Sequence, residues 1–268
     1  MSDPRSPLID PLRVRAFLEA AGRVDILAEG ECASTNTVLL QRAKEGAPPG
    51  TVLVADRQTA GRGSRGRAWV ASPEASLTFS ILWEFSGVMA RLSGLSLAAG
   101  VAVVRALAHC GVEGVTLKWP NDILHGEGKL GGILVELAAA GEAVHAVVGI
   151  GLNLRLPENV DQAGIAALPP TALERIVAIL PERNFLLAAL LDRLVRVFDR
   201  FDAEGFPGLQ EAWQSCNAWR DKPVRVLRDG HAGKEGICVG ADADGALLLR
   251  TANGLERCLS GDVSLRPR

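Results

Sequence analysis

The pattern of apolar residues changes near Asp221, and this change most limits the folds that the chain can adopt. Before it, helix-like and strand-like segments follow one another in no regular order. After it come short alternating runs at residues 224–227, 237–239, 246–249 and 257–259, which Asp and Gly turns separate. Short strands divided by turn residues are typical of small all-β units. We therefore predict two domains, residues 1–220 and residues 221–268, of which the second is a small β-barrel.

The larger segment predicts an α+β domain. β-forming apolar runs predict strands at residues 51–55, 76–83, 115–119, 133–137 and 144–150. Helical apolar spacing predicts helices at residues 13–21, 34–45, 92–110, 182–201 and 208–219. Strands and helices do not alternate regularly, as they would in a doubly wound α/β fold. We therefore expect a central mixed or antiparallel sheet with flanking helices.

Charge and hydropathy exclude several classes of partner. The 29 basic and 31 acidic side chains give a formal net charge of −2, so no overall positive field attracts nucleic acid or an anionic membrane. Residues 1–10 lack the apolar core of a signal peptide. The apolar stretch at residues 95–107 is interrupted by Ser96, Gly100 and Arg105, which predicts a buried helix and not a membrane span. The few residues before the first predicted helix are too short for a separate DNA-binding module.

The cysteines indicate a reducing compartment. There are five of them, widely spaced, and no C-x-x-C pair occurs. An odd number at these spacings predicts neither a zinc site nor a disulfide framework. Scattered thiols are typical of the cytoplasm, and we predict cytoplasmic localisation.

Residues 58–67 carry the densest chemistry. Arg62, Arg65 and Arg67 alternate with glycines directly after a predicted buried strand. Glycine lets backbone N–H groups approach an anion, and a guanidinium offers a planar fork to phosphate or carboxylate oxygens. The alternatives are a solvated basic loop and an RNA-binding segment. Gly61, Gly63 and Gly66 also match the G-x-G-x-x-G pattern of dinucleotide-binding proteins. Residues 67–73 are not expected to begin a helix, however, so we do not predict a dinucleotide site.

A second cluster ends the predicted strand at residues 115–119. Pro120 stops the strand, so Asn121 and Asp122 project at a strand end, where sites are often built. An aspartate can hold Mg²⁺ or a ribose hydroxyl, and an asparagine can orient a carbonyl or a phosphate. The alternative is a simple Pro-Asn-Asp turn.

Two further segments place glycines beside polar side chains. Lys129 lies among glycines ahead of a predicted buried strand, where it could reach a phosphate or a carboxylate. No Ser or Thr follows it, so this is not a Walker A loop. Gly149 and Gly151 leave a strand near Asn153 and permit close approach of a ligand. The alternatives are an exposed hairpin lysine and a β-bulge.

Polar and aromatic residues elsewhere add candidates. Ser34, Thr35 and Asn36 open a predicted helix, and the simplest role for them is an N-cap. The same groups also suit a neutral ligand with carbonyl acceptors. Trp69 either stacks on an adenine ring or covers an edge of the core.

Together these segments resemble the biotin–protein ligase family. The motifs S-T-N, G-R-G-x-x-G-R, K-W-P-N-D, K-L-x-G-I-L-V-E and G-x-G-x-N occur in this order between residues 25 and 155. The tail at residues 223–266 is similar to the family's C-terminal domain. The resemblance implies the biotin–lipoate ligase fold, which is similar to class II aminoacyl-tRNA synthetases, followed by an SH3-like β-barrel. It also implies a short family form without the N-terminal DNA-binding domain, and hence no specific DNA binding.

The resemblance implies a two-step reaction. The carboxylate of biotin attacks the α-phosphate of MgATP, giving biotinyl-5′-AMP and pyrophosphate. A lysine amine of a biotin carboxyl carrier protein domain then takes the biotin. This chemistry depends on positive charge at the phosphorus and on accurate positioning. ATP and Mg²⁺ are thus the implied cofactors. Some members form homodimers through edge strands, for which residues 144–150 are the candidate.

Matched residue by residue, the resemblance assigns three groups of site residues. Those expected to bind biotin are Ser34, Thr35, Asn36, Gln58, Gly61, Arg62, Lys129 and Gly132. Those expected at the nucleotide are Arg65, Arg67, Trp69, Asn121 and Asn153. Those expected to act in catalysis are Lys129, Arg62 and Asp122, with Asp122 also a candidate Mg²⁺ ligand.

One departure and three competing functions remain. Ser64 stands where some members carry an arginine that contacts the adenylate. A lipoate–protein ligase of the same fold is the nearest competitor, and the ordered G-R-G-x-x-G-R and K-W-P-N-D motifs argue against it. A non-catalytic biotin-binding protein and an RNA-binding protein are the others. The near-neutral charge and Lys129 argue against both.

Overall fold

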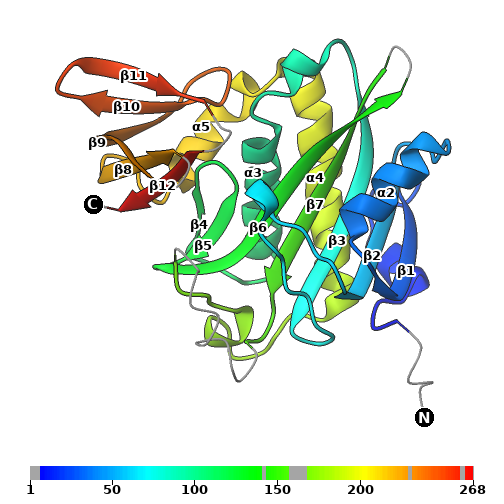
Figure 1. The fold of residues 1–268 in the computed structure, drawn as a ribbon. Helices are drawn as coiled ribbons and strands as arrows, with labels where there is room; N and C mark the ends of the chain where they lie inside the picture. Colours follow the sequence, from blue (N-terminus) through cyan, green and yellow to red (C-terminus); the bar gives the residue numbers. More distant parts are fainter. Residues whose placement is uncertain (1–6, 141–142, 157–167, 229–230, 260–262, 268) are drawn as a thin grey trace.

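A seven-stranded sheet forms the centre of the larger segment (Figure 1). The computed structural model describes residues 7–140, 143–156, 168–228, 231–259 and 263–267. The strands are β1 (Asp25–Cys32), β2 (Thr51–Gln58), β3 (Ser76–Phe85), β4 (Val115–Lys118), β5 (Asp122–His125), β6 (Gly128–Ala140) and β7 (Ala143–Asn153). Their order is β1-β2-β3-β7-β6-β5-β4. Only β1 and β2 are parallel, and all other neighbours are antiparallel. The predicted α+β fold with a mixed sheet is confirmed.

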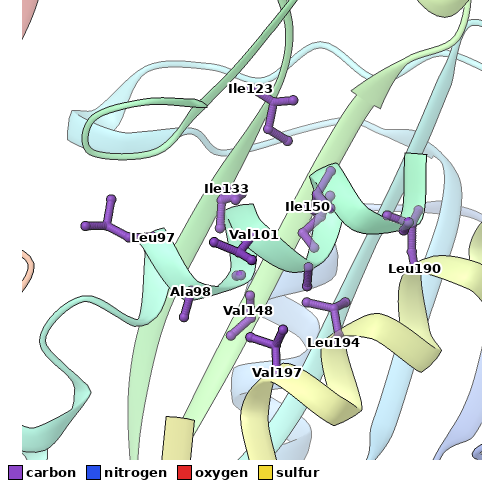
Figure 2. Packing of buried hydrophobic residues seen from close by; sticks show 14 of the residues in the cluster. Leu97, Ala98, Val101, Ile123, Ile133, Val148, Ile150, Leu190, Leu194 and Val197 are labelled. Carbon is purple, nitrogen blue, oxygen red and sulfur yellow. The ribbon is translucent and has the colours of Figure 1, made fainter. Parts of the chain in front are cut away.

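Helices cover both faces of this sheet (Figure 1). The helices are α1 (Pro11–Phe17), α2 (Thr35–Lys44), α3 (Leu95–His109), α4 (Arg183–Glu204) and α5 (Pro207–Cys216). Side chains alternate between the faces of a strand. Accordingly β7 sends Val148 and Ile150 into the core under α3 and α4, and sends Val147 to the opposite face, against Leu39 of α2. Figure 2 shows the larger core, in which Val101 of α3 and Leu194 of α4 lie beside these strand residues. The α2 face is therefore the one left for a site.

The most apolar segment lies in the interior. By length and composition alone, Met89–His109 could cross a membrane, with a mean hydropathy of 1.5. It folds as the turn η2 (Met89–Leu92) followed by α3, and most of α3 is buried. Gly94 begins α3 with φ of +84°, and a Cβ there would lie 2.8 Å from the Phe206 side chain. The prediction of a buried helix at residues 95–107 is confirmed.

The C-terminal segment forms a second, antiparallel sheet. Its strands are β8 (Pro223–Arg228), β9 (His231–Ala241), β10 (Leu247–Thr251), β11 (Gly254–Cys258) and β12 (Val263–Pro267). They pair in the order β11-β10-β9-β8-β12, so β11 and β12 are the edges, and within the described ranges no ladder joins them. The all-β prediction is confirmed, but this sheet is open where a closed barrel was expected. Trp119 Nε1 donates to Gly245 O at 3.0 Å, so the sheet supports the end of β4.

One predicted role for a strand is wrong. Residues 144–150 cannot pair with a second chain as an edge, because they lie in β7 in the middle of the sheet. From Val144 to Leu152, every residue is paired with β3 on one side and β6 on the other. The true edges are β1 and β4. A strand run of apolar residues indicates burial, but it does not specify the position in the sheet.

Two strands are absent from the sequence-based prediction, and several helices differ in their ends: α3 begins at Leu95 where residue 92 was expected, and α5 ends at Cys216 where residue 219 was expected. The sequence does not predict β1, because its acidic residues obscure the apolar alternation, and it does not predict β5, which has only four residues and begins two residues after Pro120. The first helix was expected at residues 13–21. It spans Pro11–Phe17 instead, because Asp10 caps it by accepting from Leu12 N and Pro11 occupies its first turn.

Candidate active site

The start of α2 places polar side chains against the sheet. Ser34 caps the helix by accepting from Thr37 N at 3.5 Å, as the N-cap interpretation predicts. The next two side chains point inward, so that Thr35 and Asn36 are both buried. The Ser80 hydroxyl on β3 donates to Asn36 Oδ1 at 2.6 Å and lies 2.8 Å from Thr35 Oγ1. The S-T-N motif therefore supplies both the cap and, with Ser80, a cluster of buried polar groups, which we call the polar pocket.

The glycine-arginine loop (residues 58–67) begins at this polar pocket. Gln58, at the end of β2, accepts from Thr35 N at 2.7 Å. Gly61 has no room for a side chain, because a Cβ would lie 2.1 Å from Trp69 O and 2.9 Å from Gln58 Nε2. Trp69 N donates to Gly61 O at 2.9 Å and closes the loop. The structure thus brings Gln58 and Gly61 to the S-T-N motif, as expected for a shared pocket.

The arginines of this loop lie in different surroundings. Arg62 reaches β6, where its Nη2 lies 2.9 Å from Glu136 Oε1. Arg67 folds back on its own loop and donates to Ser64 Oγ at 3.2 Å and to Ser64 O at 3.3 Å. The side chain of Arg65 lies outside the described residues. Only one of the described arginines therefore faces the pocket.

Three glycines on β6 and β7 make a floor without side chains, which we call the glycine floor: Gly132, Gly149 and Gly151. Gly132 and Gly151 are direct cross-strand partners. A Cβ at Gly149 would lie 2.1 Å from Asn36 Oδ1, and one at Gly151 would lie 2.4 Å from the Trp69 ring. β7 pairs continuously with both neighbours here, so the β-bulge alternative is wrong. The glycines instead let α2 and the Trp69 ring approach the sheet.

A buried group of charges lies at the other end of the floor. The carboxylate of Asp122 is 2.5 Å from Lys118 Nζ through one oxygen and 2.5 Å from Lys129 Nζ through the other. Asp122 and Lys118 are about 5% exposed, and Lys129 is 25% exposed. A Cβ on Gly132 would lie 3.7 Å from Lys129 Nζ, so this ammonium group sits beside the glycine floor. Lys129 is therefore a held, partly accessible cation and not an exposed hairpin lysine.

The charge state of Asp122 follows from these neighbours. Burial alone raises the pKa of a carboxyl group, but the positive charges of Lys129 and Lys118 outweigh it and lower the pKa of Asp122 to about 2. Asp122 is ionised at neutral pH and is a very weak base. Both of its oxygens contact ammonium groups, and the described residues contain no cluster of three His, Cys, Asp or Glu side chains that could hold a metal. These residues do not fit a Mg²⁺ ligand set, contrary to the metal role expected for Asp122.

Two asparagines support this end of the site. Asn121 Nδ2 donates to Ile133 O at 2.8 Å, while its Oδ1 is buried without a partner. Asn153 Nδ2 donates to Thr171 O at 3.0 Å and to Lys129 O at 3.3 Å, and so holds the backbone that carries Lys129. A buried acceptor without a donor is uncommon, so Asn121 Oδ1 remains available to accept a hydrogen bond.

The sequence did not single out several residues that complete the site. Glu136, Ser80 and Lys118 received no role, although Glu136 and Lys118 lie within the motifs. A carboxylate on the inward face of an apolar strand is the signal that could have found Glu136, because buried charges are usually paired. Ser80 carries no such signal, since a buried serine in a strand is common.

Two family matches cover both parts of the chain. Residues 30–153 match the biotin/lipoate A/B protein ligase family. Residues 221–266 match the biotin protein ligase C terminal domain. The first match contains the pocket, the loop, the floor and the charged group. The second coincides with the C-terminal sheet.

Individual proteins agree with these matches. The chain is 35% identical to the biotin–[acetyl-CoA-carboxylase] ligase of Mycobacterium tuberculosis, over 97% of each chain. It is 35% identical to the bifunctional ligase/repressor BirA of Salmonella typhimurium, over 97% of this chain and 79% of that protein. A solved biotin protein ligase from Aquifex aeolicus in complex with biotin and ATP has a TM-score of 0.76 and 31% identity, and the match covers 91% of this chain and 99% of that one. The chain therefore belongs to the biotin/lipoate A/B protein ligase family and is a ligase of its biotin protein ligase branch.

Proposed function

We propose that this chain joins biotin to ATP as biotinyl-5′-AMP and passes the biotin to a lysine of a biotin carboxyl carrier protein domain. The observation that carries the proposal is the glycine floor, with a polar pocket at one end and the Lys129 ammonium at the other. Asn36 covers Gly149 and the Trp69 ring covers Gly151, so an elongated substrate with a neutral ring and an acidic tail would lie along these side chains, between the polar pocket and Lys129. Two residues along a strand cover roughly 7 Å, which sets the length of this span. The ring of biotin would lie by Thr35, Asn36 and Gln58, and its carboxylate by Lys129.

In the first step a carboxylate oxygen of biotin forms a bond to the α-phosphorus, and the bond from this phosphorus to pyrophosphate breaks. The ammonium of Lys129 neutralises the negative charges of the biotin carboxylate and the α-phosphate. It also stabilises the charge that develops on the phosphoryl oxygens in the transition state. Asn121 would accept a hydrogen bond from the nucleotide through its free amide oxygen, and Trp69 would stack there. Arg65 and Arg67 are proposed to contact the phosphates when the loop closes.

In the second step the amine of the carrier lysine forms a C–N bond to the biotinyl carbonyl carbon, the bond from this carbon to the AMP oxygen breaks, and AMP leaves with the bonding electron pair while the nitrogen loses a proton to solvent. The low pKa of Asp122, about 2, argues against its taking the proton from this amine. We propose instead that Asp122 positions Lys129. ATP enters as its magnesium complex, and we assign no protein ligand to that metal ion.

Isotope exchange between pyrophosphate and ATP tests the proposed function. We expect exchange only in the presence of biotin, because pyrophosphate is released from ATP and taken up again only when biotin is adenylated. Lipoate is the control substrate, since the matched family includes lipoate ligases. Exchange with lipoate and none with biotin would overturn the assignment.

We further propose that residues 1–220 and 221–268 are separate domains and that the second has an SH3-like arrangement. We also propose that the protein is cytoplasmic. The family match at residues 221–266 supports the boundary. Free thiols at Cys32, Cys110, Cys216 and Cys238 support a reducing compartment. Expression of residues 1–220 alone tests the domain boundary, because a separate domain is expected to fold without residues 221–268.

Cell fractionation tests the localisation, and recovery in the membrane fraction would contradict it.

The first helix supports the proposal that this chain does not recognise DNA specifically. Val14 of α1 is fully buried, and Asp10 N donates to Asn184 Oδ1 on α4 at 2.8 Å. A helix of seven residues docked in this way is not available to enter a groove. We expect no sequence-specific gel shift with operator DNA at physiological salt, with or without biotin. A specific shift would contradict the proposal.

Because position 64 is a serine, we expect the enzyme to release biotinyl-adenylate rapidly. Its hydroxyl already accepts from Arg67, so it offers at most a neutral contact to the intermediate. An arginine at this position could add a charge-assisted hydrogen bond, worth about 1.5–3 kcal/mol when aligned. We expect Ser64→Arg to release pre-formed biotinyl-adenylate about 10-fold to 100-fold more slowly, measured without carrier protein. Ser215→Arg on α5 is the control, and an unchanged or faster release from Ser64→Arg would show that position 64 does not face the intermediate.

A further inference from the structure

One carboxylate joins the biotin pocket to the glycine-arginine loop. Glu136 of β6 accepts from Asn36 Nδ2 at 3.0 Å through Oε2, and its Oε1 lies 2.9 Å from Arg62 Nη2. The Glu136 side chain is 21% exposed, whereas that of Arg62 is 50% exposed. A mostly buried carboxylate is thus satisfied by one amide from α2 and one guanidinium from the loop.

The contact with Asn36 determines which way its amide faces. Its Oδ1 accepts from the Ser80 hydroxyl at 2.6 Å, and its Nδ2 donates to Glu136 and, at 3.3 Å, to Leu134 O. Glu136 can only accept when ionised, so the amide cannot turn over without placing oxygen against oxygen. Gly149 lies directly beneath the amide oxygen, where a Cβ would be 2.1 Å away. Glu136 therefore holds Asn36 in one orientation in the polar pocket.

The contact with Arg62 is the main side-chain link between the loop and the sheet. Among the described side-chain contacts of Arg62, the shortest is the one of 2.9 Å to Glu136 Oε1. The other two are long, at 3.4 Å to Glu136 Oε2 and 3.5 Å to Thr37 Oγ1. A glycine-rich loop costs roughly 1 kcal/mol of conformational entropy for each residue that is ordered. An ion pair with a fixed carboxylate on β6 lowers the number of loop conformations before any ligand binds.

The ion pair between Glu136 and Arg62 also affects which positive charge can meet the substrate. An ionised Glu136 on the floor side of β6 would repel the carboxylate of an incoming acid, and Arg62 compensates that charge. The guanidinium of Arg62 is thus paired with Glu136, and the ammonium of Lys129, which is paired with Asp122, is the cation that lies beside the glycine floor. This differs from the expectation that Arg62 binds the substrate carboxylate directly.

We propose that Glu136 is a positioning residue that couples the biotin pocket to the loop, acting through Asn36 and Arg62. The proposal rests on the proposed function, because it takes biotin as the ligand of this pocket. Binding of biotin against Asn36 and closure of the loop through Arg62 then share one carboxylate. Loss of that carboxylate weakens biotin binding and loosens the loop together, and affects the phosphoryl chemistry at Lys129 little.

The test compares Glu136→Ala and Glu136→Gln with a matched control, Glu84→Gln. Glu84 lies on β3, and its carboxylate is 2.9 Å from the imidazole of His145, a contact outside the Asn36–Glu136–Arg62 contacts. Biotin affinity is measured by calorimetry without ATP, and loop mobility by the rate of tryptic cleavage after Arg62, Arg65 and Arg67. We expect Glu136→Ala to weaken biotin binding about 10-fold to 100-fold, as for loss of a charge-assisted contact, and to speed cleavage. Glu136→Gln, which retains one accepting oxygen, should show a smaller effect, and Glu84→Gln none.

Steady-state kinetics and a double mutant separate positioning from a general loss of structure. We expect the KM for biotin to rise in Glu136→Gln while kcat at saturating biotin changes less than about threefold. Arg62→Ala and Glu136→Ala should not be additive in biotin affinity, because each removes the same ion pair. Glu136→Gln decides the matter if Glu136→Ala fails to fold.

Two results would be read differently. If wild type binds biotin and Glu136→Gln binds it equally well with unchanged loop cleavage, Glu136 does not position the pocket and the inference is overturned. If wild type itself does not bind biotin, the proposed function fails. Faster loop cleavage in Glu136→Gln would then still support the link between Glu136 and Arg62, since that readout needs no ligand.

Discussion

Replacement of Lys129 by alanine is expected to slow formation of biotinyl-adenylate by about 10²–10³-fold while leaving the fold intact. A group that stabilises charge developing in the transition state is typically worth this much. The structure supports this role, because Lys129 Nζ is held 2.5 Å from Asp122 beside Gly132 and is still 25% exposed to an incoming ligand. Single-turnover adenylation with saturating biotin and ATP measures the effect.

The control for this prediction is Lys44→Ala. Lys44 is an exposed lysine in the last turn of α2, outside the described site contacts, and its removal should leave the adenylation rate unchanged. Thermal unfolding should place Lys129→Ala near wild type, since Asp122 keeps its contact with Lys118. Near-normal adenylation by Lys129→Ala would show that this lysine takes no part in the reaction.

Replacement of Asp122 by alanine is expected to destabilise the protein by about 3 kcal/mol and to abolish most activity. Removal of one partner of a buried ion pair costs roughly 3–5 kcal/mol, because the opposite charge stays in a poorly solvated place. Here one carboxylate serves two ammonium groups, and Lys118 is only 5% exposed. Urea unfolding at pH 7 measures the loss. Asp244→Ala, which removes an exposed carboxylate paired with Arg257, is the control and should cost less than about 1 kcal/mol.

The pH dependence of stability provides a second check on Asp122. Its pKa is about 2 in the folded chain, below the ordinary value of 3.8, so its ionised form stabilises the folded state above pH 4. That contribution is lost as the pH falls through the folded pKa. Relative to Asp122→Asn, wild type should lose about 1 kcal/mol of unfolding free energy between pH 6 and pH 3. A constant difference across this range would mean that Asp122 is not held ionised by Lys118 and Lys129.

Much of the architecture follows from local patterns in the sequence. Runs of β-forming apolar residues predict β3 and β7, helical spacing predicts α3 and α4, and the change near Asp221 predicts the second sheet. Ser34 begins α2 because its side chain can accept from the free backbone N–H groups of a first turn. These features depend on residues close together in the chain, so they can be read without the fold. β1 and β5 could not be read in this way, because their acidic or very short sequences become strands only through pairing with β2 and β6.

The ordered motifs in turn determined the chemical class of the site. Gly61, Gly149 and Gly151 were expected to allow close approach of a ligand. In the structure the groups that approach them are Asn36 and Trp69 of the chain itself, with which a Cβ would collide. The residue types of the site can therefore be recognised in the sequence, because glycine, lysine and asparagine each suit a particular kind of contact.

Only the tertiary structure decided which of these residues act on one another. Asn36 and Glu136 are 100 residues apart, and they meet because α2 packs across β6. Lys129 acquires its position from Asp122 on the neighbouring strand, and residues 144–150 become the centre of a sheet because β3 and β6 both pair with them. Hydrogen bonds and ion pairs act over a few ångströms in space, whereas local sequence patterns report only on neighbours along the chain. The division of charge between Arg62 and Lys129 is therefore a property of the fold.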